Sequence, residues 1–69
     1  METRYFFWVL GGEYDDDALL CNISSANLYK LLDWCKTNKV TATLDKNKPE
    51  SWLEFSRCVY EGELDELGI

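Results

Sequence analysis

The sequence predicts a single α+β domain in which a small antiparallel sheet of about four strands carries one helix on one face, in the order β-β-α-β-β. Three observations indicate this fold. The chain has 69 residues, close to the lower limit for a domain held together by a hydrophobic core alone. Hydrophobic residues make up 46% of it, too many for a disordered acidic chain. Short strand-like segments flank one segment with helical spacing, so residues 1–69 are expected to form one domain.

Two segments near the N-terminus predict a hairpin. Residues 5–10 contain two Phe, a Trp and a Val, which is typical of a central strand buried on much of both faces, and a glycine pair ends it. Residues 13–17 carry four carboxylates and are expected to form a loop, after which residues 18–23 return to apolar character. Within the first strand, Trp8 is the tryptophan most strongly expected in the core.

The next segment has the spacing of an amphipathic helix. Ser24 or Ser25 suits the N-cap, because a short side-chain oxygen can accept from the free amides of the first turn. Apolar residues then recur at i, i+3, i+4 and i+7, namely Leu28, Leu31, Leu32 and Cys35. Asn38 favours the backbone conformation that ends a helix, so the helix is expected to end near it.

The remaining residues predict two further strands and an acidic end. Residues 40–44 alternate like a strand, and residues 45–50 form a polar turn with the single Pro. The core-facing residues of this strand are expected to be Val40, Ala42 and Leu44. Residues 52–60 fit a last strand, although residues 49–51 could first open a short helical turn. Residues 61–69 contain two Gly and are expected to form a flexible acidic tail or a short appended element.

One face of this sheet is expected to lack a cover, because a single helix shields only one side. Aromatic residues make up 14% of the chain, more than one thin core is expected to enclose. Phe6, Phe7 and Trp8 are consecutive and cannot all point to the helix. At least one of these rings is therefore expected on the uncovered face.

The composition argues against an enzyme. The chain contains no His, which removes the usual general base, and its acidic residues fall in segments expected to be flexible. Cys21, Cys35 and Cys58 are separated by 13 and 22 residues, which fits neither a paired disulfide framework nor a common metal site. They are expected to act as small buried hydrophobic residues. We therefore expect no catalytic residue, no cofactor and no bound metal.

The apolar run at residues 5–10 is too short for the core of a signal peptide or for a membrane span. The sequence therefore predicts a soluble, cytoplasmic protein with no membrane contact.

Negative charge is segregated along the chain, whose formal net charge is −6. Residues 1–20 and residues 51–69 each carry five acidic side chains and one basic side chain, whereas residues 21–50 carry five lysines and three acidic side chains. Repulsion from phosphates argues against direct binding of nucleic acid.

These features favour a protein-binding inhibitor. Its acidic side chains would enter the basic groove of a nucleic-acid-processing or defence enzyme in place of nucleic acid, and tryptophans would anchor the contact. The acidic candidates are Glu13, Asp15, Asp16, Asp17, Glu61, Glu63, Asp65 and Glu66, and the anchor candidates are Trp34 and Trp52. The pattern of a very short acidic domain resembles, as a class and without a shared motif, inhibitors that phages make against host enzymes.

Two alternatives remain open. In the first, the charges are ordinary solvated loops, and the protein is a homodimeric structural or adaptor module that binds through its open sheet face or an edge strand. In the second, one of the three cysteines acts as a thiol-based sensor.

Overall fold

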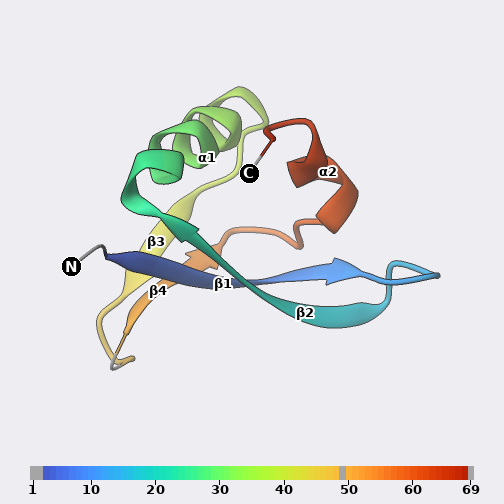
Figure 1. The fold of residues 1–69 in the computed structure, drawn as a ribbon, viewed down its shortest axis with the longest axis horizontal. Coiled ribbons are helices and arrows are strands. Elements are labelled where there is room, and N and C mark those ends of the chain that lie inside the picture. The colour runs from blue at the N-terminus through green and yellow to red at the C-terminus, as the bar shows by residue number, and fades with distance from the viewer. Residues whose placement is uncertain (1–2, 49, 69) are drawn as a thin grey trace.

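The computed structural model describes residues 3–48 and 50–68 (Figure 1). Its elements in chain order are β1 (Arg4–Gly11), β2 (Asp17–Ser24), α1 (Ser25–Thr37), β3 (Ala42–Asp45), β4 (Ser51–Phe55) and α2 (Glu61–Asp65). They form one four-stranded sheet, with α1 between the second and third strands. The predicted α+β class and the β-β-α-β-β order are therefore confirmed, and α2 is an additional short helix.

The strands lie side by side in the order β2-β1-β4-β3. The pairs β1–β2 and β3–β4 are antiparallel, whereas β1 and β4 are parallel. The sheet is thus mixed, and one of its three pairings departs from the antiparallel arrangement that the sequence predicts. The reason is that α1 carries the chain across the sheet from β2 to the far edge at β3, so that β2 and β3 run in the same direction.

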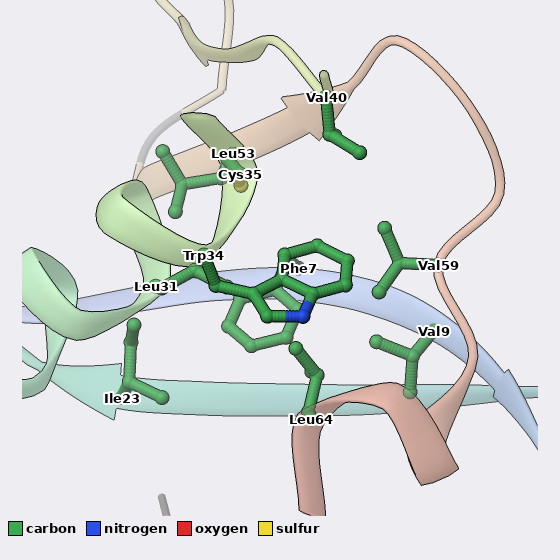
Figure 2. Close-up of a cluster of buried hydrophobic side chains, with 10 residues drawn as sticks. All are labelled: Phe7, Val9, Ile23, Leu31, Trp34, Cys35, Val40, Leu53, Val59 and Leu64. Carbon is green, nitrogen blue, oxygen red and sulfur yellow. The ribbon is translucent and has the colours of Figure 1, made fainter. Parts of the chain in front are cut away.

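Both helices cover the same face of the sheet, and the hydrophobic core lies beneath them (Figures 1 and 2). The buried core side chains are Phe7, Val9, Ile23, Leu31, Trp34, Cys35, Val40, Leu53, Val59 and Leu64. Phe7 is among the most deeply buried, and its ring meets that of Phe55 edge-on at a centroid distance of 5.5 Å. Burial of such side chains supplies about 1.5–3 kcal/mol each, which is the main stabilisation open to so small a domain.

The helix α1 has the ends that the sequence predicts. The hydroxyl oxygen of Ser24 accepts from the backbone N–H of Asn27 at 3.3 Å, which caps the N-terminus. At the other end, the side-chain amide of Asn38 donates to the carbonyl oxygen of Trp34 at 2.9 Å, and the following residue, Lys39, takes a positive φ. In the part of the chain that the structure describes, no helix is long and apolar enough to cross a lipid bilayer.

The C-terminal segment folds back onto the core, which corrects one expectation and decides between two others. The strand expected over residues 52–60 ends at Phe55, and the chain then runs beside β1, where the Leu10 N–H donates to the Val59 carbonyl at 2.9 Å. Residues 61–69 were expected to form a flexible tail or a short appended element, and the structure shows the second: they contain α2, whose Leu64 is buried in the core. The helix is held because Leu64 belongs to the core, and Leu67, just after the helix, packs against the same core beside α1.

The strand β3 differs from the pattern expected for residues 40–44. Val40 is buried, but it precedes the strand: its N–H donates to the Cys35 carbonyl at 2.8 Å, so it closes the turn that follows α1. Leu44, expected in the core, is 47% exposed. It pairs with the buried Leu53 on the neighbouring strand, but β3 is the outermost strand on that side. Its edge position leaves Leu44 open to solvent.

Candidate interaction surface

The face of the sheet opposite the two helices carries apolar side chains. Since Phe7 and Val9 of β1 point into the core, their neighbours on the strand point the other way. The strand registers place Trp8 opposite Leu20 and Phe6 opposite Trp52. We call this surface the open face; it consists of Phe6, Trp8, Leu10, Ala18, Leu20 and Trp52.

Trp8 and Leu20 are the most exposed large side chains of the open face, at 49% and 55%. The rings of Trp8 and Trp52 lie next to each other, with centroids 6.0 Å apart. Trp8 was expected in the core, and this expectation is wrong. A strand can give only alternate residues to one face, and in β1 the inward position belongs to Phe7.

The two predicted anchors, Trp34 and Trp52, lie in different surroundings. Trp34 is only 8% exposed and packs in the core, because the returning segment after β4 brings Leu64 against the same apolar face. The guanidinium of Arg57 lies 5.7 Å from its ring centroid. Trp34 therefore cannot serve as an anchor for a partner. Trp52 lies on the open face and is half-buried.

Polar contacts hold the ring of Trp52 at the border of the open face. Its indole N–H donates to the Glu54 carboxylate at 2.9 Å, and the Lys48 ammonium lies 5.7 Å from the ring centroid. At the opposite border, the Arg4 guanidinium donates two hydrogen bonds to the side-chain oxygen of Asn22, at 2.6 and 3.0 Å. The open face is thus an apolar centre with a polar rim, the arrangement common in protein interfaces.

A groove continues the open face beside Trp8. It has a volume of about 380 Å³ and lies between β1 and the segment that follows β4. It exists because β4 ends at Phe55, and the chain rejoins β1 only at the bridge between Leu10 and Tyr60. Side chains from Trp8, Leu10 and Cys58 are among those that line it. Its size suits a side chain of a binding partner.

The structure gathers part of the predicted acidic set at one end of the sheet. Glu13, Asp15, Asp16 and Asp17 are all exposed in or beside the β1–β2 turn, which projects beyond both helices (Figure 1). The start of α2 lies at the same end, because Gly11 has no side chain and lets Glu61 approach. A Cβ added to Gly11 would be 3.1 Å from the Cβ of Glu61.

The other three acidic candidates have different surroundings. Glu63 forms an ion pair with Arg57 at 2.9 Å and accepts from the Tyr60 N–H at 3.2 Å, and the hydrogen bond from Arg57 lowers the pKa of this carboxyl. Its charge is balanced within the protein. Asp65 lies at a cavity between β2 and α2, and Glu66 lies beside α1 near Lys30. The eight acidic residues therefore do not form one continuous surface.

The three cysteines differ in exposure. Cys35 is buried, Cys21 is half-buried and Cys58 is exposed. Burial raises the pKa of both inner thiols, and the charge of Glu61 raises that of Cys21 further, so both favour the unreactive protonated form. Among residues 3–48 and 50–68, no three potential ligands of His, Cys, Asp or Glu type come together as a metal ion would require.

An uncovered sheet face with at least one of the rings of Phe6, Phe7 and Trp8 on it was expected from the sequence, and the structure confirms it; that Trp8 lies there was not expected. The alternation of side chains along β1 places neighbours on opposite faces, but three consecutive aromatic residues do not reveal which of them points inward. Comparison with protein families, with curated proteins and with solved structures finds no match to this chain. The function is therefore inferred from the geometry of the open face, the groove and the acidic turn.

Proposed function

We propose that the protein acts by binding another protein, and that the open face with its groove is the contact surface. The observation that supports this proposal is the position of Trp8 and Leu20, which lie opposite each other on neighbouring strands and are both about half exposed. Exposed apolar patches with a polar rim mark interaction sites on small domains. Tryptophan is the residue that most often dominates the binding energy of such a contact.

The open face is also preorganised for binding. Its strands are fixed from behind by the core, and the indole of Trp52 is held by Glu54. A surface whose side chains are already ordered loses little conformational freedom when a partner binds, so more of the contact energy appears as affinity.

The charge of the protein indicates the chemistry of the partner. The net charge is −6, and the β1–β2 turn carries exposed aspartates next to the open face. Such a surface is attracted to an apolar patch that basic residues border. An enzyme that processes nucleic acid has basic residues of this kind around its groove. We therefore propose that the protein inhibits such an enzyme by occupying the surface on which nucleic acid would bind.

The test is capture of partners from a bacterial lysate with the purified protein and two matched variants. Trp8→Lys places a charge on the open face, and Tyr29→Lys makes the same change of charge on α1, where Tyr29 is 76% exposed. A protein retained by the wild type and by Tyr29→Lys but lost with Trp8→Lys is the expected result. The proposal fails if Trp8→Lys retains the same proteins as the wild type while its circular dichroism shows that it is folded.

The role of the acidic turn has a separate prediction. Replacing Asp15 and Asp16 by Asn is expected to slow association with the captured partner about tenfold at low ionic strength, and much less at high salt. The control variant, Asp33→Asn with Glu66→Gln, makes the same change of charge on and beside α1. Surface plasmon resonance at two salt concentrations measures both rates. If the two variants associate equally fast at low salt, the acidic turn does not guide binding and the mimicry of nucleic acid is wrong.

A further inference from the structure

The two edges of the sheet are unequal. The edge strand β3 has four residues, ends in Asp45 and is followed by Lys46 and Lys48. Short length and nearby lysines are the usual protection of a sheet edge against pairing with another chain. The other edge strand, β2, has eight residues, contains neither Pro nor Gly, and carries one charge, Asp17, at its first position. Its pairing with β1 runs without interruption from Arg4–Ser24 to Gly11–Asp17. The strand therefore contains no bulge that would hinder pairing at its free edge.

We propose that β2 pairs antiparallel with β2 of a second copy of this chain. The two-fold axis of the pair passes between the two Cys21 residues. Cys21 then lies opposite Cys21 of the second copy, and Leu19 lies opposite Ile23. Leu20 similarly lies opposite Asn22. Residues opposite each other in this register share a face of the sheet, as a continuous sheet requires. The two four-stranded sheets join into one sheet of eight strands.

The apolar pattern of β2 suits this self-pairing. Leu19, Cys21 and Ile23 all lie on the face that the helices cover, and all pack against the core or belong to it. A cavity of about 270 Å³ lies beside the strand, between β2 and α2; its lining includes the apolar Ile23 and Leu64 and, at its border, Glu61 and Asp65. In the pair, Leu19 of the second copy lies next to Ile23 at this cavity. Leu19 of each copy thereby adds an apolar contact at the edge of the other copy's core.

Charge complementarity favours this register over the one centred on Leu20. With Cys21 at the axis, Asp17 of one copy lies opposite Ser25 of the other, the first residue of α1. The first turn of α1 carries no acidic side chain, and its free amides attract a carboxylate. A register centred on Leu20 would instead place Asp17 opposite the apolar Ile23. Asp17 of each copy therefore lies at the start of α1 of the other.

The pairing goes beyond the proposed function and does not depend on it. A two-fold axis perpendicular to the sheet leaves both open faces on the same side. The dimer then presents two copies of the open face side by side, which would strengthen binding to a partner with two contact sites.

The purified protein alone tests the pairing. In reducing buffer at micromolar concentration, analytical ultracentrifugation is expected to give twice the mass of one chain. A single-chain mass under these conditions would overturn the proposal. This measurement involves no captured partner, so its failure would leave the proposed function intact, and a failed capture would leave the dimer intact.

Crosslinking tests the register. Directly opposed residues in an antiparallel pair have Cα atoms about 4.5–5.5 Å apart, within the range of a disulfide. Diamide joins two thiols into a disulfide and takes up their two hydrogens to become the hydrazine. Because burial and the charge of Glu61 raise the pKa of the Cys21 thiol, the reaction is done in mildly alkaline buffer.

Two cysteine variants identify the thiol that reacts. Cys58→Ser removes the exposed thiol and leaves Cys21, whereas Cys21→Ser leaves the exposed Cys58. Cys58→Ser is expected to give at least about ten times more covalent dimer than Cys21→Ser on a denaturing gel without reductant. Equal yields, or more dimer with Cys21→Ser, would show that the copies do not meet at Cys21 and would overturn the proposed register.

Discussion

Replacing Phe7 by alanine is expected to leave the protein largely unfolded at 25 °C. Phe7 lies at the centre of the core, is 1% exposed and contacts the ring of Phe55. Truncating a buried Phe to Ala destabilises by about 3–5 kcal/mol. A domain of this size has about the same total stability, since its core is small. Far-UV circular dichroism and thermal unfolding measure the loss.

The neighbouring residue supplies the control. Phe6→Ala removes the same side chain from the same strand, but Phe6 lies on the open face and is only half-buried. Its destabilisation is expected to be about 1 kcal/mol. If Phe7→Ala melts as a folded protein within a few degrees of Phe6→Ala, the assignment of the two faces of β1 is wrong.

The second large effect is expected at Leu64. Leu64→Ala should destabilise the fold by about 2–5 kcal/mol, because it removes a buried side chain and with it the main contact of α2. A helix as short as α2 is unstable without tertiary contacts, so its loss would also expose the apolar face beneath it. Urea unfolding measures the free energy.

Asp65→Ala is the matched control for Leu64, since Asp65 is the next residue of α2 and is exposed. Its effect is expected to stay within about 0.5 kcal/mol. Equal unfolding free energies for the two variants would mean that residues 61–65 behave as the flexible tail that the sequence suggested, and that α2 adds nothing to the fold.

The parts of the fold that local signals determine could be predicted from the sequence. The start of α1 at Ser24 and its end at Asn38 follow from short-range hydrogen bonds of these side chains. The order of strands and helix follows from the alternation of short apolar segments and one helical segment. These features depend on residues no more than a few positions apart.

Features that depend on distant contacts could not be predicted. The direction of β4 relative to β1 depends on the path of α1 across the sheet, which the residues of neither strand encode. The burial of Trp34 depends on the return of Leu64, thirty positions along the chain. The orientation of Trp8 has a different cause: the consecutive aromatic residues of β1 are compatible with either face, and burial of Phe7 under the helices leaves Trp8 on the open face.

The most direct test of the central claim, that the open face is the binding surface, is the dissociation constant of the captured partner for Trp8→Lys and Tyr29→Lys. Loss of a central tryptophan contact is expected to weaken binding by at least about 30-fold for Trp8→Lys, with Tyr29→Lys close to the wild type. Constants that agree within about twofold for folded variants would contradict the account.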